Sequence, residues 1–152
     1  MKISIVTAYH NRKKQLINTL ETIKKSLTIN DSEFILVDDC SDENERVEDL
    51  QILYPFFKVI RLEKHNKWYH NPCIPFNVGI SHAIGDIIVL QNPECLHMGD
   101  ILSYVVKNVN DTNYLTFSTY AINQVKTENI SKLNFNDGLI NNKIKEVIGE
   151  FK

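Results

Sequence analysis

Residues 2–8 read KISIVTA, and this short run of β-branched and apolar residues decides the fold class. A run of this length and composition is typical of a strand buried in a parallel sheet. Similar runs recur at residues 33–39 (EFILVDD), 57–62 (FKVIRL) and 86–90 (DIIVL), and a fifth strand is predicted at 114–117. The first run therefore opens a repeating pattern of buried strands.

Helical segments separate these strands. Apolar residues at spacings of three and four predict an amphipathic helix over residues 11–27; they are Leu16, Leu20, Ile23 and Leu27. Further helices are predicted at about 43–53, where Asp42 and Glu45 resemble a capping pair, and at 75–84, 99–109 and 139–151. Alternating strands and helices imply βαβ units, so we expect an α/β domain over residues 1–152 with a mainly parallel sheet and helices on both faces.

The composition narrows the functional class. The chain has 152 residues, 43% hydrophobic and 24% charged, with a net charge of −2, values typical of a soluble globular domain. Scattered basic residues disfavour nucleic-acid binding. The apolar runs are too short to span a bilayer, and no signal peptide is recognisable. Cys40, Cys73 and Cys95 form no CxxC pair, which favours reduced thiols and a cytoplasmic protein without a disulfide framework or zinc site.

Polar residues follow three of the predicted strands, at the edge where open α/β sheets bind ligands. They are Thr7, Ala8 and Tyr9 after the first strand, Asp38 and Asp39 after the second, and Gln91, Asn92, Pro93 and Glu94 after the fourth. Alternation along a strand points the two aspartates to opposite faces. One carboxylate can cap the following turn while the other accepts a hydrogen bond from an N–H donor such as the uracil imide. The alternative is that both cap the turn and the helix after it.

Glu94 is the candidate metal ligand. A diphosphate at a sheet edge needs a cation or N–H groups, and Mg²⁺ or Mn²⁺ prefers carboxylate oxygens. The alternative is a solvated turn glutamate. His97 lies three residues later, where a helix would place it on the same face. A capping or surface role for His97 is favoured over a second metal ligand.

Two further segments carry expectations. The pattern Asn77-x-Gly79-x3-Ala83-x-Gly85 predicts a helix packed closely on the sheet, with Asn77 in its first turn reaching the ligand crevice. In the irregular segment 63–72, Trp68 and Tyr69 are expected to anchor the loop in the core rather than form a lid. His65, His70 and His82 show no metal-ligand spacing and are expected at the surface.

Several of these motifs together resemble family 2-type glycosyltransferases. They are SIVTAYHNR (4–12), LVDDCSDE (36–43) and N-x-G-x3-A-x-G-D (77–86), followed by an apolar strand and an acidic turn. The resemblance is strongest to the branch that reads QNPE-C-x-H-x-GD (91–100) in place of Asp-x-Asp. It covers residues 1 to about 102, in the same order and spacing.

The resemblance implies a GT-A-type (Rossmann-like) fold that binds a UDP-sugar with Mn²⁺ or Mg²⁺, for inverting transfer to an acceptor hydroxyl. Thr7, Ala8 and Tyr9 would lie along the uracil and ribose, with Tyr9 stacking on the base. Asp39 would hydrogen-bond the base, Asp38 would be more structural, and Asn77 would line the donor pocket. Gln91, Asn92 and Pro93 would border the donor, Glu94 would bind the metal, and Arg12 is the best-placed cation for the diphosphate.

No acceptor-site or general-base motif of that family follows Glu94, so no catalytic residue is assigned and the acceptor, a glycan or a protein, stays open. The chain is expected to be either a piece of a longer transferase or a reduced protein. Two alternatives remain. One is a catalytically silent nucleotide-sugar-binding or scaffolding module. The other is another nucleotide-using α/β enzyme such as a nucleotidyltransferase, which the absence of glycine from residues 9–12 disfavours.

Overall fold

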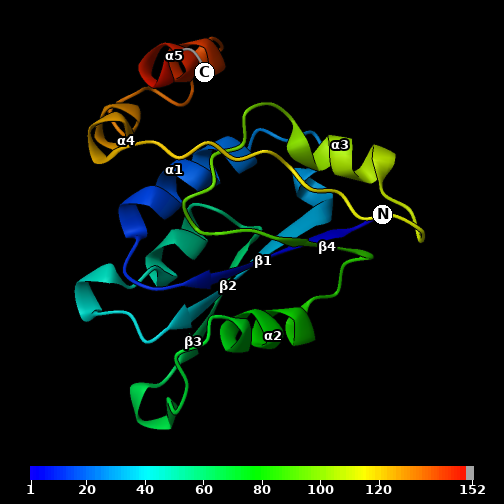
Figure 1. Cartoon of the computed structure of the whole chain (residues 1–152), viewed down its shortest axis with the longest axis vertical. Coiled ribbons are helices and arrows are strands. Elements are labelled where there is room, and N and C mark those ends of the chain that lie inside the picture. Colours follow the sequence, from blue (N-terminus) through cyan, green and yellow to red (C-terminus); the bar gives the residue numbers. More distant parts are fainter. Residues whose placement is uncertain (150–152) are drawn as a thin grey trace.

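The computed structural model describes residues 1–149, which form a four-stranded parallel sheet between layers of helices (Figure 1). Strand β1 (Ile3–Tyr9) is central. It pairs with β2 (Ser32–Asp39) on one side and with β4 (Ile87–Leu90) on the other, and β3 (Phe57–Leu62) lies outside β2. The parallel α/β sheet predicted from the sequence is confirmed.

Helices cover both faces of this sheet. On one face lie α1 (Lys13–Ile23) and α3 (Ile101–Asn108), and on the other lies α2 (Cys73–His82) (Figure 1). Two short helices, α4 (Gln124–Ile130) and α5 (Ile140–Ile148), pack on each other beyond α1. Helices on both faces hide the apolar strands from water, as a parallel sheet requires.

The main hydrophobic core fills the space between the sheet and the layer of α1 and α3. Its fully buried side chains include Ile3, Ile5, Leu16, Leu20, Phe34, Leu36 and Leu102. Each contributes roughly 1.5–3 kcal/mol relative to an exposed side chain. A smaller cluster of Ile130, Phe135, Ile140 and Ile144 joins α4 and α5 and packs against Leu96 and Met98. The core therefore lies beneath the central strands whose ends carry the polar residues.

Helix α2 approaches the sheet as closely as its small residues predict. A Cβ on Gly79 would lie 2.4 Å from Val6 Cγ1, and one on Gly85 would lie 2.6 Å from the backbone N of Ser4. The Gly85 N–H donates to Ser4 Oγ (2.8 Å), which in turn donates to Glu33 Oε1 (2.6 Å). This chain of hydrogen bonds fixes the turn between α2 and β4 against the amino ends of the strands.

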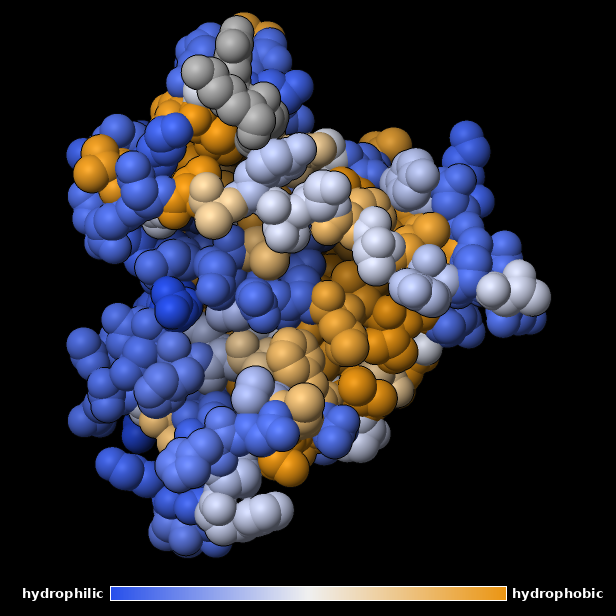
Figure 2. Space-filling view, in the orientation of Figure 1, coloured by the Kyte–Doolittle hydropathy of each residue, from blue (hydrophilic) through white to orange (hydrophobic). Residues whose placement is uncertain are grey.

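Strand β4 borders an exposed apolar surface. Ile88 and Leu90 of β4 are exposed, together with Ile80 and Ile84 in and just after α2. Figure 2 shows this apolar surface over β4 and the neighbouring end of α2. The polar strand ends described below are thus bordered by an apolar surface at the β4 edge.

The predicted helix at 43–53 is wrong. That stretch forms two 3₁₀ turns, Glu43–Glu45 and Glu48–Ile52, separated by extended backbone at Arg46. The expected capping pair serves other partners. Glu45 Oε2 accepts from Lys13 N at the start of α1 (2.8 Å), and Asp42 Oδ2 accepts from Asn11 Nδ2 (2.7 Å). The two acids therefore stabilise the turn after β1 instead of a helix of their own.

The predicted strand at 114–117 is also wrong. The segment has no strand partner in the described sheet, and Tyr114 is exposed. The predicted terminal helix at 139–151 is present as α5, and its predicted residues 150 and 151 lie outside the described residues. The first helix is shorter at both ends than predicted, and α2 begins at Cys73, two residues before its predicted start.

Cys40, Cys73 and Cys95 are free thiols, as their separation in the sequence predicts. Within residues 1–149, no helix combines the length and the apolar character needed to cross a bilayer. His65, His70 and His82 are exposed, as expected.

The close approach of Gly85 to β1 predicts a stability effect. In Gly85→Ala the new Cβ meets backbone atoms of Ser4 and Ile3, which cannot rotate away. We expect the free energy of unfolding to fall by about 1–3 kcal/mol, measured by urea denaturation. Gly138→Ala is the control, because a Cβ there meets nothing within 4 Å, and it should stay within about 0.5 kcal/mol of the unmutated protein. Equal stability of the two variants would contradict this packing.

Candidate functional site

The carboxyl ends of three strands meet at one edge of the sheet, as predicted. Tyr9 pairs with Asp38 in the ladder between β1 and β2. On the other side of β1, Thr7 Oγ1 donates to the backbone oxygen of Gln91 (3.0 Å), just after β4. The Thr7 side chain is fully buried, so its hydroxyl holds the two strand ends together and is not available to a ligand.

Two left-handed turns follow β1 and β2 and are bonded to each other. Asn11 has φ 50° and Cys40 has φ 66°, a conformation that few non-glycine residues adopt. The Asn11 side chain donates to Asp42 Oδ2 (2.7 Å) and accepts from Asp42 N (2.9 Å). Asn11 N also donates to Ser41 Oγ (3.1 Å). Because residues in such backbone conformations persist only where their surroundings hold them, the two turns form a fixed frame around the site.

Asp38 belongs to this frame. Its side chain is fully buried, with Oδ2 2.7 Å from Arg61 Nη1 and Oδ1 accepting from Ser41 N (2.8 Å). The ladder explains the ion pair, because Asp38 lies opposite Arg61 where β2 pairs with β3. Asp38 is therefore structural, as the resemblance implies, and its carboxylate is not open to a bound donor.

Asp39 is the accessible carboxylate of the pair, with 18% of its side chain exposed. Its Oδ2 lies 2.8 Å from Lys67 Nζ, and its Oδ1 accepts from the Tyr69 hydroxyl (2.9 Å). Burial and this hydrogen bond raise the pKa of Tyr69 to about 12, so the hydroxyl stays protonated and donates. The second aspartate therefore has two side-chain donors, both supplied by the segment between β3 and α2.

Neither aromatic residue anchors that segment in the core as expected, because Tyr69 is only half-buried and belongs to neither hydrophobic cluster. Tyr69 holds the segment to Asp39, whereas Trp68 is 82% exposed and packs edge-on against Tyr69 at 5.7 Å between ring centroids. Trp68 therefore exposes a large aromatic surface next to Tyr69, whose hydroxyl bonds Asp39.

The prediction that Tyr9 stacks on a base is wrong. Its ring is 1% exposed in the main core, and its hydroxyl donates to the backbone oxygen of Glu45 (2.7 Å). The exposed ring at this place belongs to the next residue, His10, whose Nδ1 lies 3.0 Å from the Asp39 carbonyl oxygen. Since a carbonyl oxygen only accepts, His10 Nδ1 carries the proton. Alternation along the strand already indicates this difference. Tyr9 shares its strand face with the core residues Ile3 and Ile5, whereas His10 does not.

The motif at residues 91–100 is held largely by contacts within the protein. His97 is buried, and its Nε2 lies 2.8 Å from Gln91 Oε1, while its backbone N donates to Thr22 Oγ1 of α1 (3.1 Å). The expected capping or surface role of His97 is therefore wrong, and its imidazole faces Gln91 rather than a metal position. Pro93 is buried as well, so among Gln91 to Glu94 only Asn92 and Glu94 are exposed.

Asp100 closes the motif. Its carboxylate caps α3 through Ser103 N (3.1 Å) and also accepts from Leu27 N (3.1 Å) and Ser26 Oγ beyond α1. Burial alone would raise the Asp100 pKa, but the hydrogen bonds from Ser103 and Ser26 outweigh it and hold the pKa at about 2. Asp100 thus ties the end of α1 to the start of α3.

Arg12 follows β1 and Glu94 follows β4, and Glu94 Oε1 lies 4.0 Å from Arg12 Nε. Both side chains are about half exposed, so this pair is weak and easily opened. Within residues 1–149, no three His, Cys, Asp or Glu side chains are grouped to hold a metal ion. A divalent ion at this place would have the Glu94 carboxylate as a protein ligand and would take further ligands from phosphate and water oxygens.

Asn77 and Ala8 complete the predicted set. Because α2 begins at Cys73, Asn77 lies in the second turn rather than the first, and it is exposed. Ala8 is half-buried at the end of β1. A hollow of about 220 Å³ borders Tyr69 and is lined also by Arg61, Leu62, Glu63, Asn66, Ile74 and Val78.

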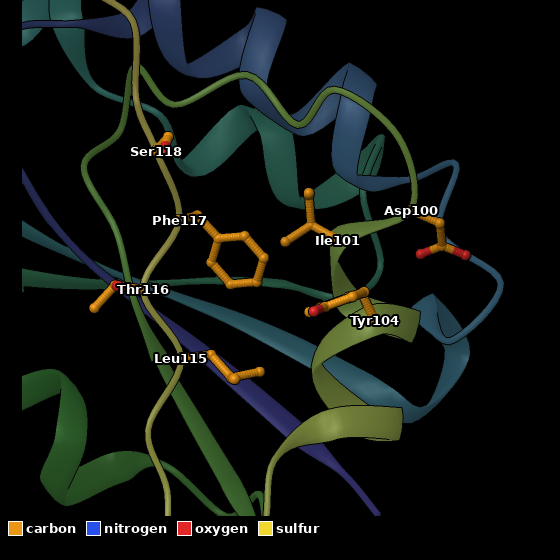
Figure 3. Close-up of a pocket in the computed structure, with 7 residues that line it drawn as sticks. All are labelled: Asp100, Ile101, Tyr104, Leu115, Thr116, Phe117 and Ser118. Atoms are coloured by element: carbon orange, nitrogen blue, oxygen red, sulfur yellow. The ribbon is translucent and has the colours of Figure 1, made fainter.

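A larger open pocket of about 430 Å³ lies elsewhere, between α3 and the extended segment 115–118. Figure 3 shows Leu115 and Phe117 pointing toward Ile101 and Tyr104, while Asp100 points away. Tyr104 and Phe117 meet edge-on at 6.0 Å between centroids. None of the residues predicted to bind a donor lines this pocket, so it is separate from the strand ends.

Comparison with known proteins identifies the family and the fold of the chain. The sequence profile described as Glycosyl transferase family 2 matches residues 4–151. S. aureus TarS 1–349 shares 21% identity and a TM-score of 0.57 over 70% of this chain and 33% of that one. The mannosyltransferase PcManGT from Pyrobaculum calidifontis, in complex with GDP-Man and Mn²⁺, is 18% identical in sequence. Its TM-score is 0.61, and the match covers 73% of this chain and 33% of that one.

TarS 1–349 in complex with UDP-GlcNAc shares 21% identity and a TM-score of 0.52 over 76% of this chain and 37% of that one. At these identities the likeness shows the fold, which is of the GT-A type. The chain spans about a third of the length of these structures. None of the curated protein sequences compared with it is a match.

The burial of His97 predicts a pH effect. Burial lowers its pKa to about 4 from an ordinary value of 6.5. Between these values the unfolded chain binds a proton that the folded chain does not, so the free energy of unfolding should fall as pH falls from 6.5 to 4. We expect this loss to reach roughly 3 kcal/mol and to be largely absent in His97→Gln, measured by urea denaturation across pH.

The exposed His65→Gln serves as the control and should keep the slope of the unmutated protein. Glu33 and Asp100 have pKa values of about 2, below the ordinary carboxyl pKa near 4. Their contributions to the free energy of unfolding are therefore lost only below about pH 4, outside the range in which His97 titrates in the unfolded chain. An unchanged slope between pH 6.5 and 5 in His97→Gln would show that His97 is not the titrating group.

Proposed function

Because the chain belongs to glycosyl transferase family 2, we propose that it binds a UDP-sugar donor at the carboxyl ends of β1, β2 and β4. The observation that carries this proposal is the Asp39 carboxylate, which is partly exposed at the strand end while its neighbour Asp38 is buried in an ion pair. The structures of relatives in complex with UDP, UDP-GlcNAc and GDP-Man support a nucleotide-sugar site on this fold.

In this proposal Asp39 accepts a hydrogen bond from the imide N–H of uracil. The exposed His10 ring, bonded to the Asp39 backbone, stacks on the base in place of Tyr9. Ala8 lies along the ribose, where a small side chain lets the donor approach β1. Arg12, at the start of α1, faces the diphosphate once its weak contact with Glu94 opens.

Glu94 would hold Mn²⁺ or Mg²⁺ together with the diphosphate oxygens, with Asn92 as its exposed neighbour. When bound, the ion neutralises the leaving diphosphate as the bond to the anomeric carbon breaks. A single carboxylate is a sparse site for an oxygen-seeking cation, so we propose that the ion binds tightly only with the nucleotide.

Inverting transfer also requires a base that deprotonates the acceptor hydroxyl of a glycan or protein. Among the described carboxylates after Glu94, Asp100 caps α3 and Asp137 pairs with Lys143. Helices α4 and α5 lie beyond α1, away from the strand ends (Figure 1). This arrangement favours a second candidate, a catalytically silent nucleotide-sugar-binding module, and sugar transfer to an acceptor is the measurement that separates the two.

The base-reading role of Asp39 predicts a preference for UDP over ADP, measured by calorimetry. Asp39→Ala should erase most of it, since a charge-assisted hydrogen bond is worth roughly 1.5–3 kcal/mol. His10→Ala should weaken UDP and ADP alike, by roughly 1–3 kcal/mol, because stacking accepts any base. His82→Ala, an exposed histidine of α2, is the control. Equal affinity of the unmutated protein for UDP and ADP would refute the assignment.

The metal role of Glu94 predicts that Mn²⁺ strengthens UDP binding. We expect roughly a tenfold gain over EDTA, about 1.4 kcal/mol, and its loss in Glu94→Gln, which keeps the shape and removes the charge. Glu63→Gln, an exposed glutamate after β3, should keep the gain. If Mn²⁺ helps Glu94→Gln as much as the unmutated protein, Glu94 is not the ligand. If it helps neither, the site works without a metal.

A further inference from the structure

Lys67 is placed beside the Asp39 carboxylate by contacts of its own segment. It follows the 3₁₀ turn Lys64–Asn66, whose hydrogen bonds include Lys67 N to Lys64 O (3.2 Å). Its Nζ lies 2.8 Å from Asp39 Oδ2 and 5.6 Å from the centroid of the Tyr69 ring. Lys67 is 25% exposed and Asp39 18%. A nitrogen donor and a carboxylate acceptor thus lie side by side at a partly open surface.

The donors that remain free decide what this surface can recognise. The Tyr69 hydroxyl has one proton, which it gives to Asp39 Oδ1, so Tyr69 orients the carboxylate. An ammonium group has three N–H donors, and Lys67 gives one to Asp39 Oδ2. The carboxylate keeps further lone pairs on both oxygens. The surface therefore offers an acceptor from Asp39 next to a donor from Lys67.

We propose that Lys67 is a specificity-determining residue that donates to a base carbonyl beside the ring N–H read by Asp39. The proposal rests on the proposed donor site. In uracil the N3–H is flanked by carbonyl oxygens on both sides, so either orientation of the ring presents one to Lys67. Cytosine presents a lone pair at N3 instead, which faces the carboxylate without a proton between them. The pair therefore selects bases with an N–H next to a carbonyl group.

Folding stability does not account for the Lys67 contact. The Lys67 and Asp39 side chains are 25% and 18% exposed, so their ion pair is partly solvated, and its loss costs the fold less than the loss of a partner from a fully buried carboxylate. The buried pair of Asp38 and Arg61, one residue earlier along β2, carries the structural role at this strand end. Replacement of Lys67 should therefore leave the fold intact and change what the site binds.

The test measures binding of UDP, CDP and uridine to the full chain and to Lys67→Met, which keeps the length of the side chain. We expect Lys67→Met to lose roughly tenfold or more in affinity for UDP and for uridine, the scale of a hydrogen bond to a charged group. The affinity for CDP should change by less than about threefold, so the ratio of UDP affinity to CDP affinity should fall. Lys64→Met is the control, because it removes the same charge from the same segment and should leave the affinity ratio unchanged. The thermal midpoint of each variant is measured to confirm that it is folded.

Three results would overturn the proposal. A loss for UDP but not for uridine would show that Lys67 contacts the diphosphate. Tighter UDP binding by Lys67→Met would show that the ion pair blocks Asp39 and must open. An unchanged UDP-to-CDP ratio would show that Lys67 does not read the base. Each of these requires UDP to bind the unmutated chain, whereas failure of UDP to bind it at all would overturn the proposed donor site itself.

Discussion

Strand β1 has a hydrogen-bonded neighbour on each edge, and this constraint fixes where the polar chain after it can go. The chain must leave the sheet between the ends of β2 and β4, so its polar groups find partners only on those two strands and their turns. Thr7 bonds the chain after β4, and Asn11 bonds the turn after β2 in both directions. The geometry of the site therefore follows from strand order, and the hydrogen bonds maintain it.

The sequence predicted those parts of the molecule that depend on local pattern. The alternation of strands and helices along the chain and the close packing of Gly79 and Gly85 follow from short-range pattern, whereas the structural role of Asp38 was implied by the family resemblance. Lys67 escaped prediction because its partner, Asp39, is distant in sequence. The exchange of Tyr9 for His10 was readable, since parity with Ile3 and Ile5 assigns Tyr9 to the core.

The motif at residues 91–100 holds the carboxyl end of α1 through hydrogen bonds of His97 and Asp100. Gln91 and His97 suit each other because a buried imidazole with a pKa of about 4 is neutral and pairs well with a neutral amide. An aspartate at position 91 would raise the His97 pKa and bury an ion pair, whose desolvation is costly. A neutral residue at position 91 therefore suits the burial of His97, while Glu94 is an exposed carboxylate of the same motif.

The charged groups of the site form two sets. Asp38 and Arg61 are the more buried set, which we call the floor, and Arg12, Glu94, Lys67 and Asp39 are the more exposed set, which we call the rim. Asp38, buried against Arg61, cannot lose its partner without leaving an uncompensated charge, at a cost of roughly 3–5 kcal/mol. The contact of Arg12 with Glu94 is about half exposed and worth little, whereas the contact of Lys67 with Asp39 is only partly exposed. In the proposed donor complex, Arg12 would turn from Glu94 to the diphosphate, while Lys67 keeps its contact with Asp39 and the floor keeps its shape. Because this requires only the weak contact of Arg12 with Glu94 to open, little of the binding energy would be spent on rebuilding the sheet edge.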